Sequence, residues 1–398
     1  MRFEKTVLQV IPALDAGGAE RTVVEMTAAI AGAGGAALVA TSGGRLAGEV
    51  ERAGGRIIIL PVQSKNPLTI LANRGRLIRV IRDEKVDIIH ARSRAPAWSA
   101  LMAARATGAA FAATYHGAYE AGSAVKRLYN SAMARADLVI ANSEFTANAI
   151  RRDYETGDRL RIIPRGADAQ QFNPEAISPD RIELLAAQWG LVENPGQLTL
   201  LLPGRLTGWK GHRVAIEAMA RLAADAESGV LPGLQLIFAG DSQGRSGYAE
   251  SLMRKVEELG LQQMIRWVGH CDDMPAAYAL ADMVLSPSTR PEAFGRVAAE
   301  AGAMGKVAIA ANHGGARETI VDGDTGFLID PDSSGALAGA IASAAALGRD
   351  GRRAMGARAR ARIVSHYSTA AMTAATLAAY EDVLIRTKET RAGTAAAK

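Results

Sequence analysis

The chain has 398 residues, of which 48% are hydrophobic and 22% are charged, and its formal net charge is +5. This composition excludes a disordered chain, and the length predicts two or three domains. The single cysteine, Cys271, excludes an intramolecular disulfide framework, and the positive charge favours an anionic partner such as a nucleotide or a phospholipid surface.

The apolar runs of the sequence fall short of the roughly 18 residues that span a bilayer. The first residues, MRFEKTVLQVIPAL, do not show the charged start, long apolar core and cleavage site of a secretory signal. We therefore expect a cytoplasmic protein. A peripheral contact with the inner face of an anionic membrane stays open at this point.

Short apolar runs alternate with helical stretches along the first half of the chain. The expected strands are residues 6–12, 37–41, 56–62, 87–91, 111–117 and 138–143. Such alternation predicts a parallel sheet with helices on both faces. A Gly-rich turn after the first strand, Asp15 to Glu20, leads into the first helix, and the glycines would let backbone N–H groups approach a phosphate or a hydroxyl. A plain strand-to-helix turn is the alternative.

The pattern restarts after residues 191–197, LVENPGQ, which we interpret as a linker. The expected strands of this second half are residues 198–206, 234–241, 265–270, 283–288, 306–311 and 326–331. From about Ser368 to Arg391 the chain is Ala-rich and helical. The fold class is therefore α/β, with two doubly wound parallel sheets and a cleft between their domains.

Two stretches concentrate arginines. Residues 71–82 place Arg74, Arg76, Arg79 and Arg82 among leucines and isoleucines, and residues 352–362 carry five more. Each stretch is interpreted as a solvated helix face, or the first as a basic amphipathic helix resting on anionic lipid. Aromatic residues make up 5% of the chain and do not alternate with these arginines, which argues against a base-stacking nucleic-acid surface.

Several polar residues follow strands, where ligands of such sheets bind. His116 ends one strand of the first half, and Arg92 and Arg94, at the end of another, could fork onto a phosphate or carry surface charge. Arg205 and Lys210 follow the first strand of the second half and could clamp a diphosphate.

The segment PEAFGRVAAE contains two glutamates around a helix start. Glu292 lies in the loop and Glu300 in the second helical turn, so they bracket the N–H groups at the start of a helix predicted from Arg296. We interpret them as contacts for neutral hydroxyl groups, one on a sugar and one on a ribose. A capping glutamate followed by an ordinary amphipathic one is the alternative. No His/Cys cluster has zinc spacing, so we expect no metal site.

These motifs, together with His313-Gly314-Gly315 and residues 323–328, occur in an order that resembles the retaining glycosyltransferases of family 4, which have the GT-B fold. Residues 90–98 and 114–119 also resemble bacterial enzymes that build lipopolysaccharide or other envelope glycans. The resemblance implies a metal-independent hexosyltransferase that moves a sugar from a UDP- or GDP-linked donor to a glycan or glycolipid acceptor, with no cofactor and no nucleic-acid partner. A nucleotide-sugar epimerase or hydrolase, and a non-catalytic glycan-binding module, are the competing hypotheses.

The resemblance also assigns domains and roles. Residues 1–192 would form an acceptor-side Rossmann-like domain, residues 193–367 the nucleotide-sugar domain, and residues 368–398 a helix that crosses back to the first domain. The implied catalytic residues are His116, beside the transferred sugar, Arg205 and Lys210 on the diphosphate, and Glu292 on the sugar hydroxyls. The implied donor-binding residues are Gly17, Gly18, Phe294, Gly295, Arg296, Val297 and Glu300. Acceptor choice would depend on loops around Arg92, Arg94 and Tyr119, and base recognition on residues 268–270.

Overall fold

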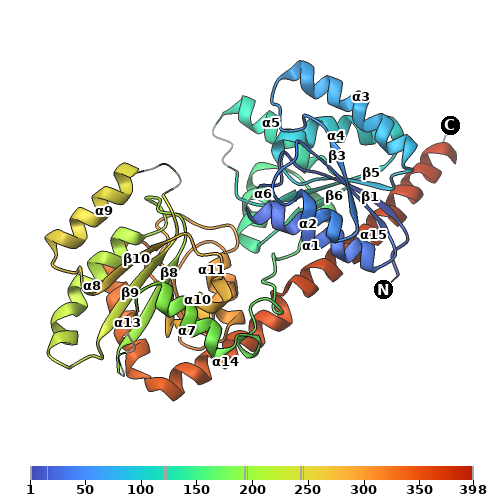
Figure 1. Ribbon diagram of the computed structural model, residues 1–398. Helices are drawn as coiled ribbons and strands as arrows, with labels where there is room; N and C mark the ends of the chain where they lie inside the picture. The colour runs from blue at the N-terminus through green and yellow to red at the C-terminus, as the bar shows by residue number, and fades with distance from the viewer. Residues whose placement is uncertain are drawn as a thin grey trace. The chain divides into compact units, whose positions relative to one another are not determined.

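The computed structural model describes residues 2–15, 17–119, 123–191, 194, 196–242, 244 and 246–396 (Figure 1). The chain divides into two compact units, which we call unit 1 (Met1–Arg165 with Ala370–Lys398) and unit 2 (Gly166–Thr369). Each is an α/β unit built on one parallel sheet, as the alternating pattern predicts.

The described part of unit 1 forms a seven-stranded parallel sheet with the order β3-β2-β1-β4-β5-β6-β7. The strands are β1 (Thr6–Val10), β2 (Ala36–Thr41), β3 (Gly55–Ile59), β4 (Ile88–Ala91), β5 (Ala110–Tyr115), β6 (Leu138–Ala141) and β7 (Leu160–Ile162). Neighbouring residues point to opposite faces, so Val7 packs into one helical layer and Leu8 into the other. Both layers are apolar, which explains why these strands read as continuous apolar runs.

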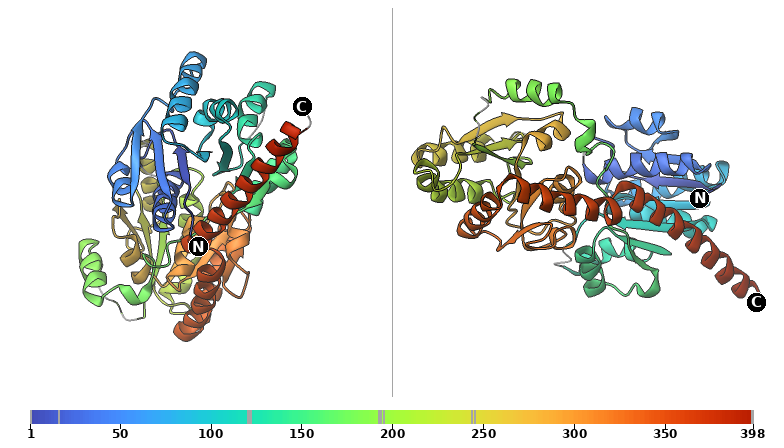
Figure 2. Two further views of the ribbon diagram at one scale, coloured as in Figure 1. Left: turned by 90° about the vertical axis from the view of Figure 1, so that its right-hand side faces the viewer. Right: turned by 90° about the horizontal axis from the view of Figure 1, so that it is seen from below.

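One face of this sheet is covered by α3 (Pro67–Asp83), α4 (Arg94–Thr107), α5 (Ala124–Ala134) and α6 (Glu144–Asp153). The other face carries α1 (Gly18–Gly32), α2 (Ala47–Arg52) and α15 (Thr369–Ala396). Helix α15, red in Figure 2, packs its Met372, Leu377 and Tyr380 into this layer. Tyr380 also forms a 2.6 Å hydrogen bond with Nδ1 of His90, so His90 has a structural contact inside the unit.

The described part of unit 2 forms a six-stranded parallel sheet with the order β10-β9-β8-β11-β12-β13. The strands are β8 (Leu198–Pro203), β9 (Leu234–Ala239), β10 (Ile265–Gly269), β11 (Met283–Ser286), β12 (Val307–Ala311) and β13 (Gly326–Ile329). Helices α8 (His212–Glu227), α9 (Ser246–Glu258) and α13 (Ser334–Ala346) cover one face. The other face carries α7 (Pro179–Gln188), α10 (Met274–Leu280) and α11 (Arg296–Ala303), while α12 (Ala316–Thr319) and α14 (Gly348–His366) complete the unit.

The division between the units differs from the expected one. The boundary that we expected at 192/193 falls on residues outside those described, and the compact units divide earlier, between Arg165 and Gly166. The reason is packing: Phe172, Ile177 and Leu185 are buried together with Tyr278 and other side chains of unit 2. Residues 166–191 therefore belong to the core of unit 2. The turn-rich segment 191–197 shows where the chain bends, but it does not show which core the preceding residues join.

The arginines of residues 352–362 are not simply a solvated face. Arg352 and Arg362 donate to backbone carbonyls of unit 2, and Arg360 bonds the carbonyls of Ala303 and Phe172. In α3, by contrast, Leu77 and Ile81 are buried while Leu68 and Leu71 are exposed. The first basic stretch is thus an amphipathic helix that leaves leucines in solvent.

Candidate functional site

The candidate donor site lies at the carboxyl edge of the unit 2 sheet. Strands β8 and β11 are neighbours although they are far apart in the chain, because the strand order reverses between them. Ligands of open α/β sheets bind at such a switch point. The loop after β8 carries Arg205 and Lys210, and the loop after β11 carries Ser288 and Glu292. The structure thus brings together the two motifs that the sequence places more than 80 residues apart.

The central contact of this edge is an ion pair. Nζ of Lys210 donates to Oε1 of Glu292 at 2.8 Å, and the two side chains are 15% and 17% exposed. Oγ of Ser288 donates to the same oxygen at 2.5 Å, and the ammonium group also lies 4.5 Å from the centre of the Trp209 ring. The ammonium has three N–H donors, so this anchor leaves donors for a phosphate. Oε2 of Glu292 accepts no hydrogen bond within the described residues and can face a hydroxyl group.

Two glycines fix the backbone that carries Glu292. The N–H of Gly315 donates to the carbonyl of Glu292 at 2.8 Å. A Cβ atom at Gly314 would lie 2.3 Å from that carbonyl oxygen, and one at Gly315 would lie 2.4 Å from Cα of Phe294. No larger residue fits this backbone-to-backbone approach, which gives the His313-Gly314-Gly315 motif a physical role as the support of the loop.

Helix α11 starts beside this ion pair. Its N-cap is Gly295, with φ of 75°, and its first residues are Arg296 and Val297. The first N–H groups of a helix lack partners inside the helix and carry the positive end of its dipole. Phe294 is 4% exposed and anchors the turn in the unit 2 core. The residues expected around the helix start are therefore assembled in one place, next to Lys210.

Glu300 lies deeper and is already engaged on both oxygens. Arg296 donates to Oε1 from Nη2 at 2.6 Å and from Nε at 3.1 Å, and the hydroxyl of Tyr278 donates to Oε2 at 2.9 Å. Glu300 is 8% exposed. Burial raises the pKa of Tyr278 well above its usual value, so its hydroxyl stays a donor. Tyr278 lies on α10 and has no local sequence motif, which is why sequence reasoning missed it.

Lys210 is the interior cation of this edge, and Arg205 lies on its rim. The side chain of Arg205 is exposed, one residue after Gly204. His212 is buried under the loop, and its ring packs edge-on against Phe238. Burial, followed by the charge of Lys210, lowers the pKa of His212 to about 4, so this ring adds no positive charge at neutral pH.

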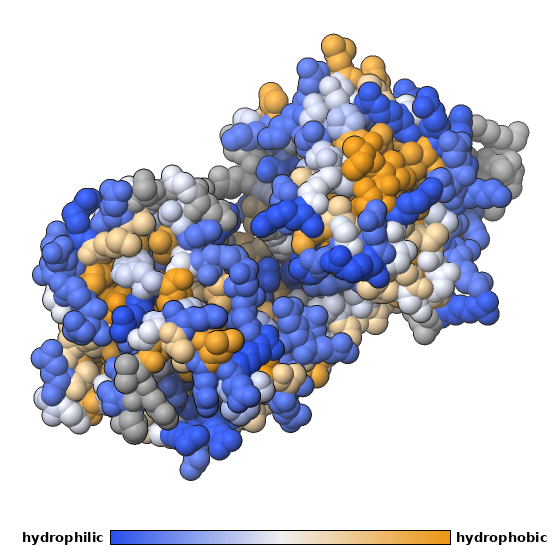
Figure 3. Space-filling model, in the orientation of Figure 1, coloured by the Kyte–Doolittle hydropathy of each residue, from blue (hydrophilic) through white to orange (hydrophobic). Residues whose placement is uncertain are grey.

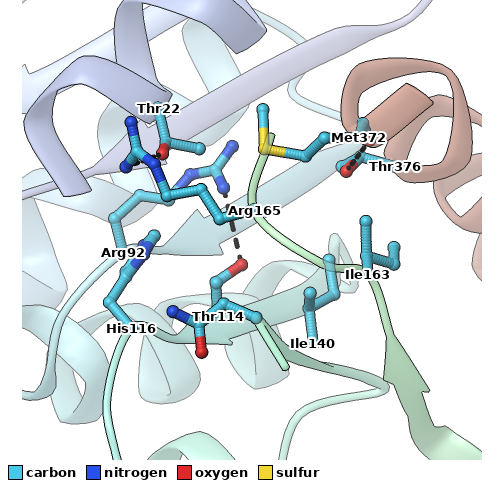
Figure 4. A pocket seen from close by; sticks show the side chains of 10 residues that line it. Thr22, Arg92, Thr114, His116, Ile140, Ile163, Arg165, Met372 and Thr376 are labelled. Carbon is cyan, nitrogen blue, oxygen red and sulfur yellow. Dashed lines mark hydrogen bonds between the residues drawn. The ribbon is translucent and has the colours of Figure 1, made fainter. Parts of the chain in front are cut away.

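His116 lies in unit 1, beside two buried arginines. It lines a small cavity of ≈ 20 Å³ together with Arg92, Arg165 and Thr114 (Figure 4). Burial, followed by the charges of both arginines, lowers the pKa of His116 well below its usual value, so the ring is neutral. Its Nε2 atom is buried and has no hydrogen-bond partner within the described residues. A neutral ring nitrogen with unused capacity can bond a water molecule in a cavity of this size.

The two arginines are held from inside unit 1. Arg92 is 2% exposed and donates from Nε and Nη2 to Oε1 of Gln9, at 3.0 and 2.7 Å, so its fork binds an amide and not an incoming phosphate. Arg165 donates to the hydroxyl of Thr22 at 2.8 Å and to the carbonyl of Gly18. The turn at Gly17 and Gly18 is thereby tied to the end of β7. Sequence reasoning missed Arg165, whose only signal is its place just after a short strand.

The residues that the structure describes contain no helix long and apolar enough to cross a membrane. Among the same residues, no group of three or more His, Cys, Asp and Glu side chains is arranged to hold a metal ion. Cys271 is partly buried, and burial raises the pKa of its thiol.

Family comparisons agree with this geometry. The model described as "Glycosyltransferase Family 4" matches residues 16–171, and that described as "Glycosyl transferases group 1" matches residues 186–362. The crystal structure of a glycosyltransferase from Rickettsia africae superposes with a TM-score of 0.88 at 32% identity, covering 96% of this chain and 99% of that one. The chain belongs to glycosyltransferase family 4. The expected GT-B class, with two Rossmann-like α/β domains, is confirmed with it.

Curated relatives of this glycosyltransferase chain are themselves glycosyltransferases. A "D-inositol 3-phosphate glycosyltransferase" of Corynebacterium glutamicum is 31% identical over 215 residues, 52% of this chain, and the chain spans about half (49%) of that relative. A "GDP-mannose-dependent alpha-(1-6)-phosphatidylinositol monomannoside mannosyltransferase" of Mycolicibacterium smegmatis is 28% identical over 321 residues, 76% of this chain and 79% of that one. These relatives give the epimerase hypothesis no support.

Proposed function

We propose that this protein is a retaining glycosyltransferase that moves a sugar from a nucleoside-diphosphate sugar to a glycan or glycolipid acceptor. The observation that carries the proposal is the Lys210–Glu292 pair at the switch point of unit 2, beside the start of α11. It combines a cation for a phosphate with a carboxylate that has an unused oxygen for a sugar.

The proposed chemistry needs stabilisation of one developing charge. The bond between the anomeric carbon and the diphosphate breaks, the acceptor oxygen bonds the same carbon on the same face, and the acceptor proton passes to the leaving phosphate. Negative charge grows on the diphosphate, and Arg205, Lys210 and the N–H groups from Phe294 to Val297 would stabilise it without a metal. Glu292 would hold the sugar hydroxyls. Glu300 would accept a hydrogen bond from the ribose if Arg296 also remains bound to its carboxylate or moves away from it.

We propose that the nucleoside of the donor is uridine or guanosine. A structural neighbour from Anabaena is described "in complex with UDP and glucose". It is 23% identical, with a TM-score of 0.78, and the match covers 94% of this chain and 99% of that one. At this identity the similarity shows a shared fold and no more. The mycobacterial relative is named as GDP-mannose-dependent. We assign Gly17 and Gly18 to the diphosphate and acceptor, and His116 to the transferred sugar, on the family resemblance alone.

The proposed acceptor belongs to a bacterial envelope glycan such as lipopolysaccharide, which makes a peripheral membrane contact part of the proposal. Leu68 and Leu71 of α3 are 78% and 54% exposed and lie on a helix with four arginines. Figure 3 shows orange residues over α3 at the top of the view. Exposed leucines with flanking arginines suit an anionic lipid surface.

A thermal-shift panel of uridine, guanosine, adenosine and cytidine diphosphates and their sugar conjugates tests the donor site. A ligand at about 100 times its dissociation constant adds roughly 2.7 kcal/mol to the native state. A shift with one base supports the proposal and names the donor. An absence of shifts contradicts the donor site. Acceptor-dependent release of nucleoside diphosphate then separates a transferase from an epimerase, which leaves the diphosphate bond intact.

A further inference from the structure

A second pocket lies at the carboxyl edge of the unit 1 sheet. The strand order there reverses between β1 and β4, and the pocket is lined by residues that follow both strands, Pro12 after β1 and Ser93 to Ala95 after β4. Its volume is ≈ 920 Å³, which is ample for a sugar with a charged substituent. It is separate from the small cavity at His116.

The charged side chains among the described lining residues of this pocket are all positive. Its described lining residues include Lys65, Arg94 and Lys126 and no acidic residue. Other arginines of the same unit have carboxylate partners, such as Arg21 with Glu49. None of the three pocket cations forms an ion pair within the described residues. Three cations that have no acidic neighbour among the described lining residues repel one another, and a bound anion would relieve this repulsion.

The pocket also fixes the orientation of its arginine. The guanidinium carbon of Arg94 lies 4.2 Å from the centre of the Tyr119 ring, and Nη1 is 3.5 Å from Oδ1 of Asn130. Stacking on a ring orients a guanidinium and leaves its other N–H donors in the plane of the group, where they can fork onto an oxyanion.

Tyr129 supplies a second observation that points to a ligand. It lines the same pocket, and its hydroxyl is buried without a hydrogen-bond partner in the described part of the chain. A buried hydroxyl without a partner costs stability, so one is uncommon unless a water or a ligand completes it. The rings of Tyr119 and Tyr129 add apolar surface for the body of a ligand.

We propose that this pocket binds a phosphate ester carried by the acceptor, with Arg94 as the fork and Lys65 and Lys126 as point charges. The inference rests on the proposed function and names the class of its acceptor. A phosphate offers more oxygens and more charge than a carboxylate, and so engages three cations together. The volume exceeds that of a phosphate ion, so the group belongs to a larger organic molecule, a soluble sugar phosphate or a lipid headgroup.

Calorimetry on the full chain tests the inference, with nucleoside diphosphate at saturation so that the donor site is filled. The probes are inositol 1-phosphate and glucose 6-phosphate against inositol and glucose. We expect the phosphorylated probes to bind at least tenfold more tightly, and Arg94→Gln to remove that advantage. Arg52→Gln, an exposed arginine of unit 1 outside the pocket, is the control for net charge and should bind as the wild type does.

Equal binding of phosphorylated and unphosphorylated probes overturns the inference, and so does an Arg94→Gln protein that retains the preference. Binding to vesicles of phosphatidylinositol is then compared with binding to vesicles of phosphatidylcholine, to identify the source of the phosphate group. Arg94-dependent binding to the phosphatidylinositol vesicles alone indicates a lipid headgroup. A failure of the proposed function can be distinguished from a failure of this inference. If only the proposed function is wrong, nucleoside diphosphates do not bind, while the phosphorylated probes still do.

Discussion

Nζ of Lys210 and Oε1 of Glu292 lie 2.8 Å apart although 82 residues separate them in the chain. The pair joins the loops that follow two adjacent parallel strands, β8 and β11. The two side chains can therefore meet only because these strands are neighbours in the sheet. A lysine that is held by a carboxylate keeps its position before a ligand arrives, and this preorganisation is what stabilises a developing anion.

Lys210→Ala is expected to lower the rate of sugar transfer by about 10²–10³-fold, the cost of removing one charge-stabilising donor. Steady-state kinetics with a saturating acceptor measure it. Lys255→Ala is the matched control, because Lys255 also forms an ion pair in unit 2, with Glu217 at 3.1 Å, away from the switch point. Unchanged turnover in Lys210→Ala would remove this residue from the diphosphate site.

Glu292→Gln is expected to separate sugar recognition from phosphate binding. The amide keeps the contacts to Lys210 and Ser288 but removes a negative charge, so a bare nucleoside diphosphate should bind at least as tightly as before. Transfer should fall by roughly 10–10²-fold because the sugar loses a charged acceptor. Calorimetry and kinetics on the same preparation test this: an equal loss in both would show that Glu292 acts by holding Lys210 for the diphosphate and not by binding the sugar.

Glu300→Gln tests the ribose contact. If Glu300 holds the ribose, the variant should bind a ribonucleoside diphosphate about tenfold more weakly, while binding of the 2′,3′-dideoxy analogue should not change. Tyr278→Phe serves as the comparison. It leaves Oε2 of Glu300 without its donor and should reduce the free energy of unfolding by about 1–3 kcal/mol. Equal weakening for both nucleotides would show that Glu300 only supports the helix.

His212 predicts a dependence of stability on pH. Its pKa is lowered to about 4 in the folded protein, from 6.5, so the unfolded chain binds more protons between these values. Stability is therefore full above about pH 6.5 and declines as the pH falls toward 4, by about 3 kcal/mol from this group. Urea denaturation from pH 7.5 to 4.5 should show a shallower decline for His212→Gln than for wild type. The exposed His366→Gln should keep the full decline.

Treatment with a chelator should leave transfer unchanged, since the proposed charge stabilisation comes from Arg205, Lys210 and backbone N–H groups. The measurement is initial rate before and after chelation, with magnesium and manganese added back. A loss that a divalent ion restores would contradict the metal-free mechanism.

The sequence predicted the order of the elements better than their grouping. All twelve strands expected from apolar runs occur. The central strands are apolar because they are buried on both faces, whereas the edge strands β3 and β10 are only partly buried. Strand β7 was missed, since three residues that include Arg161 form no apolar run. Residues 166–191 were assigned to the wrong unit because turn residues indicate where a chain bends and not which core it joins. The motifs placed Lys210 and Glu292 at strand ends, whereas their contact depends on strand order.

The contacts of Glu300 and Arg165 show the other limit. Tyr278 and Thr22 reach them from distant helices, and nothing in their local spacing indicates a partner. Such contacts depend on how each helix packs on the sheet and on the direction in which each side chain then points.

Helix α15 has a consequence for how the chain is made. Unit 1 consists of two segments, and its core includes Tyr380, which synthesis adds after all of unit 2. On the ribosome, unit 2 can finish folding while the sheet of unit 1 still exposes the apolar surface that α15 will cover. Nascent unit 1 is therefore the part that needs protection from aggregation, and a fragment ending at residue 369 should depend on a chaperone to stay dispersed.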